Sequence, residues 1–233
     1  FKGSRALFSV MCEFDCTKIV FSSSASVYGS SSDGFFSEES EIMPSNPYGE
    51  TKAAIENLLL EITKKNDNEW RILNLRYFNP AGAHSSGLIG DDPVNKNRNI
   101  FPILNEVASR KKKEFFIFGK SWNTFDGTCI RDYIHIEDLA EAHVKGLDYL
   151  LKTKSKYTTL NIGTGLGTSV LDLINAFKEV NKCKIPIQYV DKREGDVGIL
   201  VAKVNLVYDV LGWKAKRSLH DICKDNLRWQ KRN

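Results

Sequence analysis

The fold is decided by the stretch KIVFSSS at residues 18–24. Its apolar centre and short length are typical of a strand that is buried in a parallel sheet. A second apolar stretch follows at residues 71–78, and the periodic segment between the two, at about 47–65, predicts a helix. Strand, helix and strand in this order form a βαβ unit, so the sequence predicts an α/β protein with a parallel sheet.

The helix of this unit carries residues that are suited to proton transfer. Ser or Asn at residues 45–46 can cap its amino end, and Pro47 suits its first turn. Tyr48 and Lys52 are four residues apart, so they project from the same face of the helix. Ser24 ends the first strand, and ligands of open α/β sheets bind at such strand ends. Each of these residues alone is more simply explained as structural, but together they suggest proton-transfer chemistry.

The rest of the chain continues to alternate between helices and strands. The residue patterns predict helices at 1–16, 100–110 (with Asn99 as cap), 137–151, 169–181, 204–211 and from 218, and strands at 115–118, 159–163 and 185–190. Residues 82–98 are rich in Gly, Asp and Asn, which favours a long functional loop. The segment GTGLG at residues 163–167 lacks the glycine spacing of a dinucleotide-binding loop, so we interpret it as a turn.

Composition and charge exclude several classes of function. The chain has 233 residues with 33 Lys and Arg against 29 Asp and Glu, and this net charge of +4 is too small to indicate nucleic-acid binding. The basic run at residues 110–113 is interpreted as the solvated end of a helix. Five cysteines without a C-x-x-C pair, and four scattered histidines, favour neither disulfides nor a metal site. We therefore expect a reducing, cytoplasmic location, and neither a membrane nor a nucleic acid as partner.

Several motifs are more specific together than any one of them is alone. SSSASVYG at residues 22–29, PYGETK at 47–52 and RYFNPAGAH at 76–84 resemble the extended short-chain dehydrogenase/reductase superfamily. DGTCIRDYIHIEDL at residues 126–139 and REGD at 193–196 narrow the resemblance to the family of the UDP-glucose 4-epimerases, also called UDP-galactose 4-epimerases. The resemblance covers essentially the whole chain, in order.

The resemblance implies a fold with two domains. Residues 1–80, with 132–163 returning to them, correspond to the later part of an NAD(P)-binding Rossmann-like domain, which has a doubly wound parallel sheet. Residues 81–131 and 164–233 correspond to a smaller α/β domain that binds the UDP-sugar. The family's glycine-rich turn for the NAD pyrophosphate does not occur in this sequence, so we expect roughly 100 further residues before it in the whole protein. We expect no retained NAD on this chain alone, and a homodimer at full length.

The resemblance also implies a reaction. It is NAD-dependent epimerisation at C4 of a UDP-hexose, which interconverts UDP-glucose and UDP-galactose through a transient 4-keto sugar in galactose metabolism. Tyr48 would take the proton from the 4-hydroxyl group, and Lys52 would favour the phenolate because a nearby cation stabilises an anion. Ser24 would bind the same oxygen and relay the proton.

Binding roles come from the same resemblance. The residues expected to bind NAD are Ser22, Ser24, Tyr48, Lys52 and Tyr77. The residues expected to bind the substrate are Ser24, Tyr48, Asn79, Asn99, Ile100, Ile117, Phe118, Arg131, Arg193 and Asp196. Arg131 and Arg193 correspond to arginines at the diphosphate, whose oxygens suit the guanidinium fork. Asp196 corresponds to a residue at the uridine ribose.

Other functions stay open at this stage. The substrate can be another UDP-sugar that carries an N-acetylhexosamine, a pentose or a uronic acid, and Leu200, at the position that gates space for an N-acetyl group, does not decide this. A non-catalytic sugar-nucleotide-binding remnant is the alternative of another class, because the cofactor motif is absent from this sequence. Intact Ser24, Tyr48 and Lys52 favour the enzyme. A 4,6-dehydratase is disfavoured, since Ala and Ser at residues 25–26 replace its acidic pair.

Overall fold

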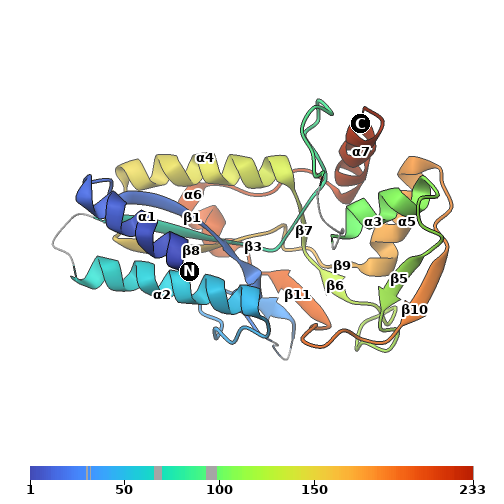
Figure 1. Cartoon of the computed structure of the whole chain (residues 1–233), viewed down its shortest axis with the longest axis horizontal. Coiled ribbons are helices and arrows are strands. Elements are labelled where there is room, and N and C mark those ends of the chain that lie inside the picture. Colours follow the sequence, from blue (N-terminus) through green and yellow to red (C-terminus); the bar gives the residue numbers. More distant parts are fainter. Residues whose placement is uncertain (30, 32, 66–69, 93–98, 233) are drawn as a thin grey trace.

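The computed structural model describes residues 1–29, 31, 33–65, 70–92 and 99–232, and it has two halves that lie side by side (Figure 1). The helices are α1 (Lys2–Glu13), α2 (Pro47–Lys65), α3 (Ile100–Ala108), α4 (Ile136–Lys152), α5 (Val170–Asn181), α6 (Asn205–Leu211) and α7 (Leu219–Gln230), with a 3-10 turn η1 (Ala25–Val27). The strands are β1 (Lys18–Ser24), β2 (Phe35–Phe36), β3 (Arg71–Tyr77), β4 (Asn79–Ala81), β5 (Phe115–Phe118), β6 (Ile130–Arg131), β7 (Tyr133–His135), β8 (Tyr157–Ile162), β9 (Thr168–Ser169), β10 (Ile187–Val190) and β11 (Ile199–Ala202).

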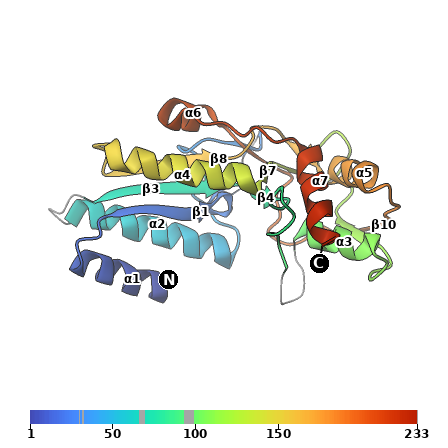
Figure 2. The same cartoon turned by 90° about the horizontal axis from the view of Figure 1, so that it is seen from above.

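The main sheet is parallel, in the order β1-β3-β8. Helices α1 and α2 cover one face, and α4 and α6 cover the other, which gives the three layers seen in Figure 2. Side chains of β3 alternate between these layers: Ile72 packs with Leu59 of α2, whereas Leu73 packs with Leu139 of α4. The predicted βαβ unit and the α/β class are therefore confirmed.

The other half contains small sheets and a second core. Strands β5 and β10 pair in parallel, β4 pairs with β7, and β2, β11, β6 and β9 form a mixed sheet. Helices α3, α5 and α7 share a core that includes Phe101, Phe177 and Ile222. The main sheet lies within residues 1–80 and 132–163, the ranges that we propose as one domain.

The predicted helices and long strands all form, with corrected ends. The first helix was predicted to run to residue 16, which is wrong: it ends at Glu13, and Asp15 adopts a left-handed conformation with φ of +51°. The helix predicted to end at residue 110 ends at Ala108, because Arg110 has φ of +60°. Residues 93–98 of the predicted loop lie outside the described residues. The short strands β2, β4, β6, β7, β9 and β11 were not predicted.

A buried ion pair fastens α2 to the sheet. The Arg76 Nη2 atom lies 2.5 Å from Glu56 Oε2, and the two side chains are only 5% and 3% exposed. Arg76 Nε also donates to Glu56 Oε1 (3.0 Å), and the Ser23 hydroxyl donates to the same carboxylate. Arg76 donates to the Tyr28 hydroxyl (3.0 Å), which donates to Asn161 (2.7 Å). One network thus joins α2 to β1, β3 and β8.

Replacing one partner of this pair should strongly destabilise the protein. We expect Arg76→Met to lower the free energy of unfolding by about 3–5 kcal/mol, because it leaves the Glu56 carboxylate buried without its cation. The double variant Glu56→Leu/Arg76→Met should recover most of this loss, since two apolar side chains need no partner. Urea denaturation of the parent, the single and the double variant measures both effects. A single variant within about 0.5 kcal/mol of the parent, the range of an ordinary surface substitution, contradicts this role of the pair.

Candidate functional site

Ser24 and Tyr48 meet at the carboxyl edge of the main sheet. Asn46 caps α2, since its Oδ1 accepts from the Gly49 amide (2.9 Å). At Gly49 the helix approaches η1 so closely that a Cβ atom would lie 2.1 Å from the Ser26 carbonyl oxygen, so only glycine fits. This approach brings the Tyr48 phenol beside the Ser24 hydroxyl, and their hydrogen bonding favours the phenolate.

Lys52 lies below the Tyr48 ring, one helical turn along α2. Its Nζ is 5.6 Å from the centroid of the Tyr48 ring and 5.1 Å from that of Phe21. It donates to the Ser22 carbonyl oxygen at 2.7 Å. Burial lowers the pKa of Lys52. An ammonium group has several N–H donors, so others are left to bind a ligand.

The pKa of Tyr48 is raised above its ordinary value. Partial desolvation of the phenol is the main cause, although Tyr48 is still 53% exposed. The hydrogen bond with Ser24 acts in the opposite direction, and a charge on Tyr77 would raise the pKa further. The expected lowering by Lys52 is therefore not found, because its ammonium group is directed to the Ser22 carbonyl and not to the phenol oxygen. For Tyr48 to act as a base near neutral pH, the site needs a further positive charge.

The residues expected to bind NAD lie together at this edge. Tyr77 pairs with Ser24 in the sheet, and the Ser22 hydroxyl lies 3.1 Å from His143 Nε2, whose ring is 6.1 Å from that of Tyr77. Hydroxyl and ammonium groups of this kind hydrogen-bond well to ribose hydroxyls and carboxamides. This donor set, on β1, β3 and α2, fits the nicotinamide-ribose half of NAD.

The glycine-rich turn after β8 is filled by a carboxylate. Asp132 is fully buried and accepts from the Thr164 amide (2.8 Å), the Gly165 amide (3.0 Å) and the Ala202 amide (3.2 Å). Burial raises the pKa of Asp132, while these hydrogen bonds oppose that rise. Because the amides of this turn already bind Asp132, they are not free to bind a phosphate. The segment is therefore a turn, as predicted, and that it binds no nucleotide stays a prediction.

A cavity of about 920 Å³ lies next to this edge. Eight of the residues expected to bind substrate line it: Asn79, Asn99, Ile100, Ile117, Phe118, Arg131, Arg193 and Asp196. Within the described ranges, Ser24 and Tyr48 are not part of its lining. They adjoin it through Tyr77, which ends β3 two residues before Asn79 begins β4.

Two guanidinium groups give the cavity a cationic wall. Arg131 Nη1 donates to the carbonyl oxygens of Ile130 (2.9 Å) and Gly198 (3.4 Å). The Arg193 guanidinium carbon lies over the Phe118 ring, 3.5 Å from its centroid. Guanidinium groups bind phosphate oxygens in paired hydrogen bonds, so this wall suits a diphosphate.

The side chains of Asn99 and Leu200 lie in positions that the sequence did not predict. Asn99 stands at the cap position of α3, but its side chain makes no capping hydrogen bond and donates to Asp91 (3.3 Å). In the described part of the chain, Leu200 does not line the cavity; it packs with the cluster that contains Ala25 and Phe36. Its side chain therefore does not narrow the cavity.

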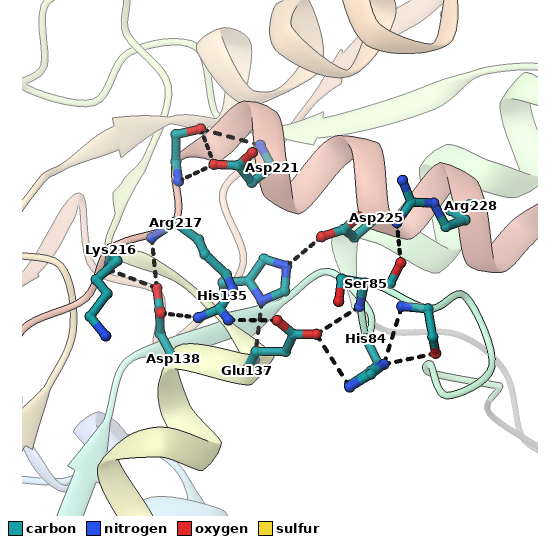
Figure 3. A network of polar contacts seen from close by, with 12 residues as sticks. His84, Ser85, His135, Glu137, Asp138, Lys216, Arg217, Asp221, Asp225 and Arg228 are labelled. Carbon is teal, nitrogen blue, oxygen red and sulfur yellow. Dashed lines mark hydrogen bonds and ion pairs between the residues drawn. The ribbon is translucent and has the colours of Figure 1, made fainter.

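Sequence reasoning missed several residues of the cavity, among them His84, Tyr133, Glu137 and Asn226. Burial raises the pKa of Tyr133 to about 12, so this phenol stays protonated. Glu137 belongs to the polar network in Figure 3: it pairs with Arg217 (2.7 Å) and accepts from the Ser85 amide (2.7 Å). His84, Tyr133 and Glu137 lie within the motifs at residues 76–84 and 126–139, but no role was predicted for them. No local pattern marks Asn226, which contacts between distant segments bring to the cavity.

No metal-ligand cluster occurs within the described ranges, where no three His, Cys, Asp or Glu side chains gather suitably. All five cysteines are free thiols. Among the helices that are described, none combines the length and the apolar character needed to cross a membrane.

The raised pKa of Tyr48 predicts a distinct alkaline titration. Well below pH 10 the phenol is neutral in the folded and the unfolded chain, so it contributes no pH dependence there. Above that pH the unfolded chain ionises first, so stability is lost as the pH rises. The ultraviolet absorbance of phenolate, measured on the parent and on Tyr48→Phe, should give a difference that titrates above pH 10. A difference that titrates below pH 10 contradicts the burial described here.

Comparisons with known proteins assign the family. The model of the NAD dependent epimerase/dehydratase family matches residues 1–163. UDP-glucose 4-epimerase of Bacillus subtilis (strain 168) is 42% identical over 231 residues, which are 99% of this chain and 68% of that protein. UDP-glucose 4-epimerase 2 of Arabidopsis thaliana is 41% identical over 99% of this chain, which spans 66% of its length, just under two thirds.

Solved structures give the same result. UDP-glucose-4-epimerase from Stenotrophomonas maltophila, with bound NAD and formylated UDP-arabinopyranose, superposes with a TM-score of 0.95 at 40% identity, over 99% of this chain and 68% of that one. UDP-glucose 4-epimerase from Bifidobacterium longum, in complex with NAD+ and UDP, superposes with a TM-score of 0.93 at 38% identity, over 99% and 68% of the two chains. The Rossmann-like fold class is thereby confirmed. The chain belongs to the NAD dependent epimerase/dehydratase family, in the branch of the UDP-glucose 4-epimerases.

Proposed function

We propose that the whole protein interconverts UDP-glucose and UDP-galactose by epimerisation at C4, with NAD as cofactor. One observation carries the proposal: a single cavity, lined by Arg131 and Arg193, adjoins the sheet edge that presents Ser24, Tyr48 and Lys52. The names of the relatives support it. Since the chain spans about two thirds of their length, the activity is proposed for the whole protein.

The cavity would hold the UDP part of the substrate through charge and stacking. Arg131 and Arg193 would bind the diphosphate, because their guanidinium groups lie on the cavity wall and suit phosphate oxygens. Phe118 and Ile117 offer apolar contact to the uracil ring, and Asp196 offers acceptors to the ribose hydroxyls. Asn79, Asn99 and Ile100 line the same cavity and would complete the substrate contacts.

Tyr48 would act as the base on the sugar. Its phenolate would accept the proton of the 4-hydroxyl group, and the Ser24 hydroxyl would hold the same oxygen and relay the proton. When bound, NAD would supply a reversible hydride acceptor and a positive charge beside the phenol. That charge matters here because burial raises the pKa of Tyr48. Ser22, Lys52 and Tyr77 would orient the nicotinamide side, where their polar groups gather.

UDP-N-acetylglucosamine and UDP-N-acetylgalactosamine are the second pair of substrates to assay, because leucine at position 200 does not decide whether an N-acetyl group fits. A non-catalytic role is disfavoured, because Ser24, Tyr48 and Lys52 remain assembled.

The setting of the enzyme is part of the proposal. The five free thiols suit a reducing compartment, so we place the protein in the cytoplasm, in galactose metabolism. Leu7, Val10 and Phe14 of α1 and its end are exposed apolar side chains, which supports burial in a homodimer or against another part of the whole protein.

Removing the phenol should abolish most of the activity. In the whole protein with NAD, Tyr48→Phe should lower kcat for UDP-galactose by about 100-fold or more, because the base is lost while the ring remains. A coupled assay of UDP-glucose formation measures this. Tyr208→Phe is the matched control, since Tyr208 is exposed on α6, outside the site, and should turn over like the parent. Equal turnover by Tyr48→Phe and the parent would remove Tyr48 from the mechanism.

A further inference from the structure

Helix α7 contributes a polar side chain to the cavity that the proposed function does not use. Asn226 lines the cavity and is only 4% exposed, and its Oδ1 has no hydrogen-bond partner among the described residues. A buried acceptor without a donor is unfavourable, and in a binding site it marks a place where a ligand donates. We propose that Asn226 is a binding and specificity-determining residue, whose side-chain oxygen accepts a hydrogen bond from a hydroxyl group of the bound sugar nucleotide. This inference rests on the proposed function.

The face of α7 that carries Asn226 lies against the loop that lines the cavity. Ile222, Asn226 and Trp229 are spaced by four and three residues, so they share one face of the helix. A Cβ atom on Gly82 would lie 3.3 Å from the Ile222 Cα, and one on Gly90 would lie 2.5 Å from the Trp229 ring. Both glycines line the cavity. Since they contact residues on either side of Asn226, the helix face that carries Asn226 lies against this part of the cavity wall.

The neighbours of Asn226 hold the helix in this orientation. Asp225 Oδ2 lies 3.3 Å from Nε2 of the buried His135, and Asp225 Oδ1 lies 3.4 Å from Arg228 Nη1. Arg228 also donates to the Ser85 carbonyl oxygen, as Figure 3 shows. These contacts restrict rotation of α7 about its axis. The Asn226 oxygen is therefore positioned before a ligand arrives, which lowers the entropic cost of binding.

Because Asn226 Oδ1 is a hydrogen-bond acceptor, only the donor groups of the ligand can bind to it. A carboxamide oxygen is an acceptor only, so it does not bind phosphate or carbonyl oxygens. The donors of a UDP-sugar are the hydroxyl groups of the hexose and of the ribose, together with the N–H group of uracil. Comparing UDP with UDP-glucose separates these sources, because only the second carries the hexose.

Leucine at this position tests the inference, since it has the same branched arrangement of side-chain heavy atoms as asparagine but no acceptor. We expect Asn226→Leu to bind UDP-glucose about threefold to tenfold more weakly than the parent, the effect of one hydrogen bond. A loss with UDP-glucose alone assigns the contact to the hexose, and a loss with both ligands assigns it to the uridine. Isothermal titration calorimetry on the chain measures both affinities. Lys224→Ala is the control on the same helix, because Lys224 is exposed, and should bind like the parent.

Thermal unfolding separates a binding role from a structural one. Without ligand, Asn226→Leu should melt at the parent's temperature or above it, because the unpaired buried acceptor is gone. Asn226→Ala should show the same loss of affinity. Unchanged affinity for both ligands in both variants, or an affinity loss that follows a lower melting temperature in both, overturns the inference. A parent that binds neither UDP nor UDP-glucose overturns the proposed function as well, whereas a parent that binds them no better than its variants overturns this inference alone.

Discussion

The buried ion pair between Glu56 and Arg76 is the contact on which the proposed chemistry depends. Glu56 follows Lys52 by one helical turn and Tyr48 by two, so all three share a face of α2. Arg76 directly precedes Tyr77, and Ser23, which also binds Glu56, directly precedes Ser24. The pair therefore sets where the proposed base lies relative to the strand ends. A buried, multiply hydrogen-bonded pair tolerates little displacement, which is what proton transfer requires.

The buried carboxylate of Asp132 positions residues that line the proposed substrate cavity. It lies between β6 and β7, so its position also determines those of Arg131 and Tyr133, which line the cavity. By accepting from amides of the turn after β8 and of β11, it joins the main sheet to the mixed sheet. The network of Glu137 and Arg217 then holds the loop after β4 over the cavity. The two regions of the site are thus connected by buried polar contacts, and hydrophobic packing is only part of what places them.

Much of this arrangement was predictable from local patterns. The periodicity of apolar residues and the turn residues at the ends indicate long strands and amphipathic helices. The bounds of β1, α2 and β3 were therefore predicted almost to the residue. Eight of the substrate residues that the motifs implied, including Arg131 and Arg193, do line one cavity. Their gathering follows from the parallel sheet, which collects strand ends at one edge.

The features that were not predictable depend on contacts between distant segments. Strands β6 and β11 show no clear period in the sequence, and they form through their pairing with each other. Asn226 reaches the cavity only because Gly82 and Gly90 let α7 approach the loop. The rise in the pKa of Tyr48 comes from burial, which outweighs the expected effect of Lys52. Sequence patterns therefore identify candidate site residues. The protonation and the spatial neighbours of these residues can be found only from the folded structure.

A crystal structure of this chain with UDP-glucose is the decisive test of the proposed site, because the cavity and the sheet edge are both present in the chain. We expect diphosphate oxygens within hydrogen-bond distance of Arg131 and Arg193, and a hexose that extends toward the Tyr48 hydroxyl and Ser24. A nucleotide bound outside the cavity, or a hexose directed away from Tyr48, would contradict it.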